Sequence, residues 1–247
     1  MLLRCLAIAA LGVGVAAQAP DDRAPDAATT QRFRNHNQTF EIDLPAGWRL
    51  LAPNEASRLG EAPGTPMLLH QSLPRTNFAL GPVDAWFAGD FSAPWLYVVE
   101  FDEAWYIDDD YAAKIADKWR EQSEAGDTRY EVSEIRREKL GTQQVECVTA
   151  VRLTTPPGPR PQLRSLDVYA PTASQKVVFS FACPPDAFDR WQPEFRRWLA
   201  TLTFARVPRE QESLSDRLWT PIITGGLVGI VLIVLYRHTK ARRQAAR

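Results

Sequence analysis

The residues QQVECVTAVRLTTPPGPRPQLRSLDVYAPTASQKVVFSFAC, at positions 143–183, decide the fold of this chain. They contain three runs rich in apolar and β-branched side chains, at Gln143–Leu153, Leu163–Ala170 and Gln175–Cys183. Turn-forming residues separate these runs, including a Pro-Pro-Gly-Pro sequence in the first gap and Pro171-Thr172 in the second. Such runs, bounded by such residues, are typical of β-strands. We therefore predict three consecutive strands in an antiparallel meander.

The segments on either side extend this meander. Arg129–Arg136 is predicted as a preceding strand, and the turn between it and the meander lies at Gly141-Thr142. Pro185–Leu202 is predicted as a helix, whose broad apolar face consists of Phe188, Trp191, Phe195, Trp198, Leu199 and Leu202. Pro193 has no N–H to donate to residue 189, so we expect a fresh helical segment to begin there.

The residues before position 129 indicate a mixture of strands and helices. Gln38–Leu44 alternates apolar and polar side chains, and Trp95–Phe101 is a compact apolar run, so both are predicted as strands. Glu55–Leu59 is predicted as a short helix, whereas residues 60–93 are interrupted by proline and glycine and read as irregular. Asp108–Ala125 is the clearest helix in this region, with Tyr111, Ile115 and Trp119 on one face.

Late consecutive strands flanked by helices predict an α+β fold, in which helices cover a mostly antiparallel sheet. The two cysteines of this region lie on the first and third strands of the meander, which run parallel with one strand between them. At about 3.3 Å per residue, the sulfurs of Cys147 and Cys183 would be on the order of 20 Å apart. A disulfide needs Cα atoms within about 7 Å. We therefore predict two separate, mostly buried thiols.

A stretch of uncharged residues near the C-terminus predicts a membrane span. Residues 219–236 (WTPIITGGLVGIVLIVLY) would extend roughly 27 Å as a helix, close to the thickness of the hydrocarbon core of a bilayer. Trp219 and Tyr236 suit the two interfaces, and the residues that follow include Arg237, Lys240, Arg242 and Arg243. Positive charge favours the cytoplasmic side, so the bulk of the chain is expected outside. A buried helix of a soluble core is the alternative.

The N-terminus agrees with this topology. A charged residue, Arg4, precedes a short apolar core and then small residues, the pattern of a secretory signal cleaved after Ala17, with an uncleaved N-terminal anchor as the alternative. The predicted organisation is a signal peptide at 1–17, a flexible leader at 18–37, an extracytoplasmic domain at 38–205, a linker at 206–217, a transmembrane helix at 218–236 and a basic tail at 237–247. This places the chain in the inner membrane of a bacterial cell, with lipid as one partner.

Two short stretches resemble the PsbP-like family. Residues 40–48 (FEIDLPAGW) are similar to the opening strand and turn of that family, and Val177–Ala182 with residues 188–204 is similar to its last strand and helix. The resemblance covers roughly 38–205. It implies an α/β/α sandwich and a binding or assembly role without catalytic activity, and it supplies no metal ligands.

The residues themselves nominate no catalytic, cofactor or metal site. The formal net charge of −1 gives no electrostatic footprint for nucleic acid. The sequence lacks a nucleophile elbow, a zinc-binding helix motif and a phosphate loop, and Ser180 and Cys183 on a predicted strand are read as packing residues. The histidines are too scattered for one metal site, at His36, His70 and His238. The acidic residues of 102–110 are read as helix capping rather than as a calcium site.

The aromatic residues are the most informative candidates for binding. Of the eight tryptophans, Trp48, Trp119, Trp191 and Trp198 fall on predicted core faces. A second aromatic group lies in or beside the irregular region and is predicted to contact a partner: Trp86, Phe87, Phe91, Trp95 and Trp105. We expect a non-enzymatic module that binds another envelope protein through residues 78–106. The alternative is a small-ligand receptor or enzyme with a pocket between the sheet and residues 60–106.

Overall fold

The computed structural model describes residues 29–207 apart from 63, 67, 68, 70–76, 103–106, 108, 109, 173 and 174. Its elements in chain order are β1 (Thr30–Arg34), β2 (Phe40–Pro45), β3 (Arg49–Leu50), α1 (Pro53–Gly60), β4 (Asn77–Gly81), α3 (Val83–Phe87), β5 (Trp95–Phe101), α4 (Tyr111–Ala125), β6 (Arg129–Leu140), β7 (Val145–Thr155), β8 (Leu163–Pro171), β9 (Lys176–Cys183), a 3₁₀ turn (Pro185–Ala187), α5 (Phe188–Ala200) and β10 (Thr203–Phe204).

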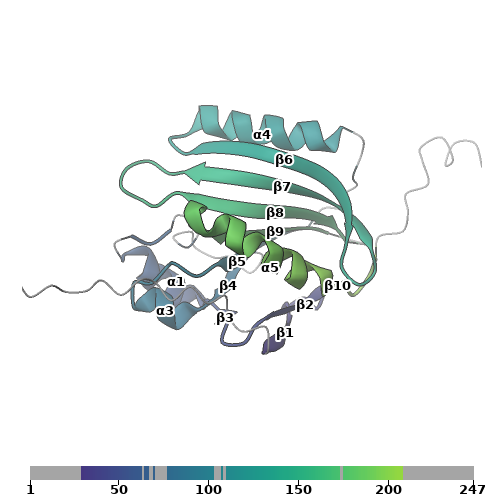
Figure 1. The fold of residues 1–247 in the computed structure, drawn as a ribbon, viewed down its shortest axis with the longest axis horizontal. Helices are drawn as coiled ribbons and strands as arrows, with labels where there is room; N and C mark the ends of the chain where they lie inside the picture. The colour runs from purple at the N-terminus through teal and green to yellow at the C-terminus, as the bar shows by residue number, and fades with distance from the viewer. Residues whose placement is uncertain are drawn as a thin grey trace, which may run out of the picture.

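A seven-stranded sheet forms the centre of the fold, with the strand order β3-β4-β5-β9-β8-β7-β6 (Figure 1). Every neighbouring pair is antiparallel, and β6 to β9 run as a continuous meander. A smaller sheet of β1, β2 and β10 lies below it in Figure 1. The predicted α+β class and the predicted meander are both confirmed.

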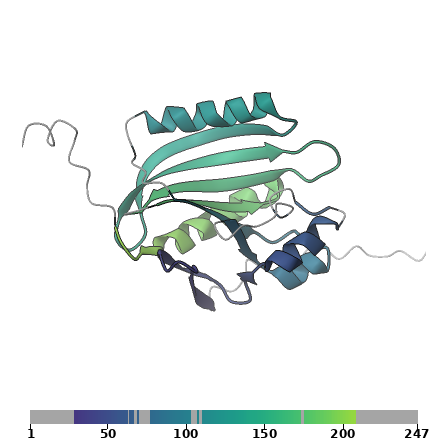
Figure 2. The same ribbon diagram turned by 180° about the vertical axis from the view of Figure 1, so that it is seen from behind.

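Successive side chains of a strand point to opposite faces, and this alternation divides the large sheet into two sides. On β9, Phe179 and Phe181 belong to the main core, where Phe181 stacks on Phe195 of α5 at a centroid distance of 5.3 Å. Val178 and Ser180 point to the other face, which α4 covers in part. Helices α4 and α5 therefore lie on opposite faces of the sheet, as Figures 1 and 2 show.

The main core fills the space between the sheet, α5 and the small sheet. Many of its large side chains come from β2, the turn between β2 and β3, β9 and α5. They make a series of ring contacts, such as Phe40 with Phe179 and Trp48 with Trp198. Helix α5 buries the face predicted from its sequence, but it is continuous through Pro193, so the predicted restart is wrong. Pro193 and Asp189 are both exposed, so water can bond to the carbonyl that loses its partner.

The other face of the sheet carries two smaller apolar clusters. One lies beneath α4 and joins Ile115 of the helix to Val148, Ala150 and Tyr169 of the sheet. The second lies beneath α1 and α3 and is built from residues that include Trp86, Trp95 and Tyr97. Each cluster covers one end of the face, so the middle of the face lies between two separate packing units.

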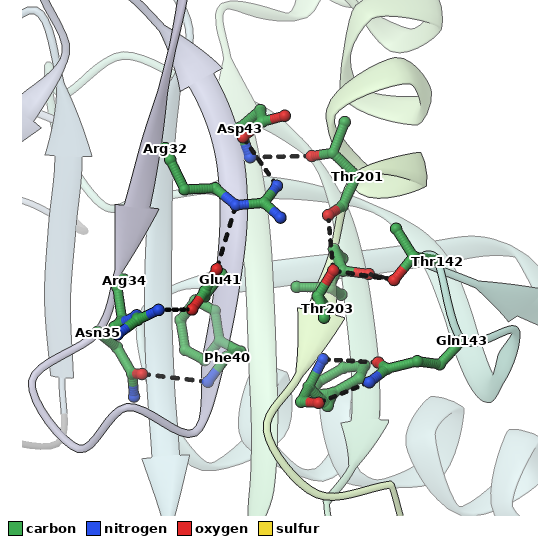
Figure 3. Close-up of polar contacts among 12 residues, drawn as sticks. Arg32, Arg34, Asn35, Phe40, Glu41, Asp43, Thr142, Gln143, Thr201 and Thr203 are labelled. Carbon is green, nitrogen blue, oxygen red and sulfur yellow. Dashed lines mark hydrogen bonds and ion pairs between the residues drawn. The ribbon is translucent and has the colours of Figure 1, made fainter.

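Strand β1 corrects one prediction, because residues 30–34 were expected to belong to a flexible leader. Its sequence, TQRFR, is polar, and its strand structure depends on its partner β2. Arg32 pairs with Asp43 at 2.8 Å and with Glu41 at 3.2 Å, and Arg34 also pairs with Glu41 (Figure 3). Phe33 packs against Phe40 and Phe78. Cross-strand pairs of this kind are what stabilise sheet edges.

The region 60–93 is more ordered than its prolines predict. Its described part contains β4, which pairs with both β3 and β5, and the short helix α3. Gly81 permits this arrangement, because a Cβ at that position would lie 2.3 Å from Cζ2 of Trp86. The close approach of the Trp86 ring to β4 is therefore the reason that the last position of this strand needs glycine.

The two thiols are free and buried, as predicted. The register pairs Val148, the residue after Cys147, with Tyr169 and hence with Val178, which lies five residues along β9 from Cys183. Within the described residues, no helix is long and apolar enough to cross a membrane. The predicted signal peptide at 1–17, the transmembrane helix at 218–236 and the basic tail lie outside those residues.

Candidate functional site

A pocket of about 370 Å³ lies on the α4 face of the sheet, between the two smaller clusters. Volumes of this size are at the lower end of those that hold small molecules. Its aromatic lining is Tyr97, Phe101, Tyr111, Trp119, Tyr130 and Tyr169, and its aliphatic lining is Val99, Ile115 and Val178. Its polar lining is Asn77, Lys114, Lys118, Gln122, Arg152, Lys176 and Ser180. Six strands, β4 to β9, and the helix α4 thus supply one concave surface.

The tyrosines place hydroxyl groups within this apolar lining. Tyr169 is 7% exposed, and its hydroxyl oxygen accepts a 2.8 Å hydrogen bond from Nε1 of Trp119 on α4. Burial, together with the negative charge of Asp167, raises the pKa of Tyr169 above its ordinary value. Burial likewise raises the pKa of Tyr97, although a hydrogen bond with Asn77 partly offsets the effect. Both hydroxyls therefore keep their protons at neutral pH and can donate hydrogen bonds.

A buried ion pair lies on the sheet beneath α4. The Arg152 guanidinium donates to Asp167 at 2.5 and 3.1 Å and to Thr154 at 2.7 Å, and Ser165 donates to the same carboxylate at 3.0 Å. Trp119 covers the guanidinium at 4.3 Å from its ring centroid. Burial alone would lower the pKa of Arg152, but the charge and hydrogen bonds of Asp167 raise it overall. This pair is neutral as a unit and fixes the position of Trp119.

The remaining charges of the lining are all positive. Lys114 and Lys118 project from exposed positions of α4, and Lys176 begins β9 with its amino group 4.3 Å from the ring centroid of Phe101. None of the described residues that line the pocket is acidic. The lining therefore combines an aromatic interior with lysines from two different elements.

A second hollow, of about 390 Å³, lies between the β2–β3 turn and α5. Proline, alanine, glycine and tryptophan make up most of its lining, and Arg190 is its charged residue among those described. It offers few convergent polar groups to orient a ligand. The pocket beside α4 is therefore the better candidate site.

The structure corrects the predicted partner-binding residues on α3 and β5. Trp86 and Trp95 are 1% and 0% exposed, and their rings pack edge to face at a centroid distance of 6.4 Å. They fill the cluster beneath α1 and α3, so they cannot anchor a partner on the surface. A run of aromatics in a proline-rich region predicted exposure, but β4 and α3 provide a buried place for them.

The other predicted residues have different positions. Phe87 is 39% exposed with Arg58 over its ring at 5.1 Å, while Phe91 is half-buried against the same cluster. Trp105 lies outside the described residues, as do the predicted membrane-interface residues Trp219, Tyr236, Arg237, Lys240, Arg242 and Arg243. Among the described residues, the predicted aromatic contacts that are not buried are therefore Phe87 and Phe91.

The remaining candidates behave as packing or solvated groups. Among the residues that the structure describes, no three His, Cys, Asp or Glu side chains lie close enough to hold a metal ion. Burial raises the pKa of Cys183 to about 12, so this thiol is not a thiolate nucleophile at neutral pH. Asp110 is the N-cap of α4 but makes no side-chain capping bond. Ser180 is the exception, because it lies in the pocket rather than in the apolar core.

Comparison with known proteins gives a likeness of fold. No protein-family model and no curated protein matches the chain. Cyanobacterial PsbP from Synechocystis sp. PCC 6803 is 13% identical with a TM-score of 0.48, and the match covers 77% of this chain and 99% of that one. A protein from Bacteroides thetaiotaomicron is 14% identical (TM-score 0.38; 73% and 49% covered), and the Ran-binding protein Mog1p of Saccharomyces cerevisiae is 12% identical (TM-score 0.39; 68% and 84%).

The PsbP-like resemblance of the sequence is confirmed in the fold, an α+β arrangement with an antiparallel sheet and few helices. At these identities the likeness concerns the fold alone. The site must therefore be argued from the geometry of this chain, and only one wall of it, Asn77 with Tyr97, Val99 and Phe101, belongs to the region where the sequence placed a pocket.

Proposed function

We propose that this chain is a non-enzymatic binding domain, tethered at the outer face of a bacterial inner membrane, that captures a small molecule in the pocket beside α4. The observation that carries this proposal is the pocket itself. It is a hollow of about 370 Å³ in which hydroxyl, amide and ammonium groups converge on an aromatic interior. Sites that bind small molecules combine these properties.

The chemistry of the lining supports binding rather than catalysis. Its described residues include no carboxylate, imidazole or thiol, the groups that most often transfer protons or attack a substrate. The raised pKa values of Tyr97 and Tyr169 make these hydroxyls donors of hydrogen bonds rather than bases. A ligand would therefore be held and oriented without being activated.

The proposed membrane tether is inferred from the sequence at both ends of the chain. The secretory pattern of residues 1–17, the uncharged stretch 218–236 and the basic residues after it agree on one orientation, with membrane lipid as a partner. An envelope protein remains a second partner predicted from the sequence. Of the predicted aromatic contact residues that the structure describes, Phe87 and Phe91 are the two that are not buried.

Labelling of single cysteines tests this orientation. In right-side-out membrane vesicles, a membrane-impermeant maleimide should label the full chain with Asp127→Cys, since Asp127 is exposed in the described domain. The same reagent should label Ala245→Cys only after the vesicles are permeabilised. Cys147 and Cys183 are buried and give a low background. Labelling of Ala245→Cys in sealed vesicles, with Asp127→Cys protected, would reverse the proposed topology.

Filling the pocket tests the binding function. Val178 is half-buried on the pocket floor, so Val178→Trp should place an indole in the hollow without disturbing the main core on the opposite face. We expect a small molecule to co-purify with the full chain from its native membrane, and we expect Val178→Trp to reduce its occupancy at least about 100-fold. Native mass spectrometry of the chain in nanodiscs measures both.

Leu50→Trp is the matched control, because Leu50 is 46% exposed and outside the pocket, so its variant should retain the molecule. The thermal unfolding of both variants should stay close to that of the unmodified chain. If the co-purified molecule is retained equally by Val178→Trp, the pocket is not its site, and the proposed function is wrong.

A further inference from the structure

We propose that the pocket beside α4 binds an aromatic carbonyl compound, whose carbonyl oxygen accepts a hydrogen bond from the hydroxyl group of Ser180. This inference rests on the proposed function and adds the chemical class of the ligand. Two features carry it, namely a buried hydroxyl without a partner on the pocket floor and a wall of aromatic rings beside it. It does not depend on the charges around the pocket.

Ser180 lies on β9 in the interior of the sheet, and its side chain lines the pocket. Its neighbours across the strands are Tyr97 on β5 and Asp167 on β8. The residue is only 5% exposed, yet the part of the chain that the structure describes offers no hydrogen-bond partner to its Oγ atom. Burying a hydroxyl without a hydrogen bond is unfavourable. A ligand that bonds to this group therefore gains an interaction that the free protein lacks.

The polar groups across the strands from this serine already have partners. The Asp167 carboxylate accepts hydrogen bonds from Arg152 and from Ser165. The hydroxyl of Tyr97 has a hydrogen bond with Asn77. The serine hydroxyl is therefore left to bond with a ligand.

A second hydroxyl in the lining favours a ligand group that accepts hydrogen bonds. The oxygen of Tyr169 accepts a 2.8 Å hydrogen bond from Nε1 of Trp119, so the O–H of Tyr169 remains as a donor. The hydroxyl of Ser180 can donate as well. A carbonyl oxygen, which only accepts, suits both hydroxyls, whereas a donor on the ligand would leave the Tyr169 proton without an acceptor.

Aromatic rings of the helix and the sheet meet in pairs along one wall of the pocket. Trp119 of α4 and Tyr130 of β6 lie with their ring centroids 4.7 Å apart, and Tyr111 of α4 and Tyr169 of β8 form an edge contact at 6.1 Å. Rings of this kind contact a further aromatic ring in offset-stacked or edge-to-face arrangements, which are more favourable than the buried area alone. We therefore expect an aromatic body against this wall and a carbonyl group directed at the sheet.

A matched pair of probes isolates the carbonyl oxygen. 2-Acetylnaphthalene and 2-isopropenylnaphthalene share one aromatic body and are both uncharged, and the C=O of the first is C=CH₂ in the second. Equilibrium dialysis of the full chain in nanodiscs, with empty nanodiscs as the blank, measures both affinities. We expect the ketone to bind at least about threefold more tightly, although it is the more polar molecule. Val178→Trp should abolish the binding of both probes, which locates them in the pocket.

A serine variant identifies the source of the preference. Ser180→Ala should weaken the ketone about three- to tenfold, the net value of one hydrogen bond, and should leave the alkene unchanged. Ser133→Ala removes the same oxygen at an exposed position of β6 outside the pocket and should affect neither probe. Without a probe, Ser180→Ala should unfold at the same temperature as the unmodified chain or at a higher one. A lower temperature would mean that the hydroxyl already bonds within the protein, and the inference would be wrong.

The outcomes separate the two proposals. Equal affinity for the two probes, no binding of either, or an equal loss of both in Ser180→Ala overturns the carbonyl class. The proposed function still stands in that case if a co-purified molecule is lost from Val178→Trp, and the structure of that molecule then gives the correct class. If the preference for the ketone survives in Val178→Trp, the ketone binds elsewhere, and the inference is again overturned.

Discussion

Replacing Asp167 with asparagine should lower the free energy of unfolding by about 3–5 kcal/mol, the cost of leaving one member of a buried ion pair without its partner. Asp167 is 1% exposed and Arg152 is 3% exposed, so neither charge can be solvated in place. Trp119 covers the guanidinium, and the pair is bonded to Thr154 and Ser165. Urea unfolding of the full chain in nanodiscs, followed by tryptophan fluorescence, measures the change.

Two comparisons make this result specific to burial. Asp117→Asn breaks the exposed pair with Arg120 on α4 and should change stability by about 0–1 kcal/mol. The double variant Arg152→Met with Asp167→Leu removes both charges and should recover much of the loss, because a well-packed apolar pair can replace a buried ion pair. If Asp167→Asn lowers the free energy of unfolding by no more than Asp117→Asn does, Arg152 is not left as a buried charge without a partner, and the prediction is wrong.

The meander was predictable because its signals are local. Strands β7, β8 and β9 each have a continuous run of β-formers, and proline or glycine follows each of the first two. The same locality explains α5, whose aromatic residues recur at helical spacing. The order of these strands then follows from short connections, which favour neighbours in sequence as neighbours in a sheet.

Strand β1 shows that local sequence signals do not identify every strand. Its arginines give no apolar period, and they are stabilised by Glu41 and Asp43 on a strand that sequence analysis treats separately. Trp86 was misassigned for a related reason. An aromatic residue near prolines can lie on the surface or in the core. Trp86 lies in the core because β4 and Gly81 allow its indole to approach closely, and this contact is a tertiary feature.

The pocket could not be predicted from the sequence, because it too depends on tertiary structure. Its tyrosines come from β5, α4, β6 and β8, so their convergence depends on the strand order and on which face α4 covers. One signal was present in β5, where Tyr97, Val99 and Phe101 alternate with the core residues Leu96 and Val98. A strand with apolar residues on both faces predicts that other parts of the chain pack on both faces of the sheet. It does not predict that this packing leaves a pocket on one of them.

Replacing Trp86 with alanine should lower the free energy of unfolding by about 3–5 kcal/mol, the usual cost of removing a large aromatic side chain from a core. The indole is 1% exposed, packs edge to face on Trp95 and lies directly against Gly81. No neighbour can fill the cavity without moving α3 or β4. Thermal and urea unfolding of the full chain in nanodiscs measure the loss.

The next residue of the same helix provides the control. Phe87 is 39% exposed, and Phe87→Ala should cost no more than about 1 kcal/mol. Trp86→Phe should also be mild, because Nε1 of Trp86 is buried without a hydrogen-bond partner among the described residues, and phenylalanine removes that polar group while keeping most of the ring contacts. The contrary result would be a Trp86→Ala variant that loses no more stability than Phe87→Ala but no longer recovers an envelope partner. Trp86 would then be a surface contact residue, and the buried position described for it would be wrong.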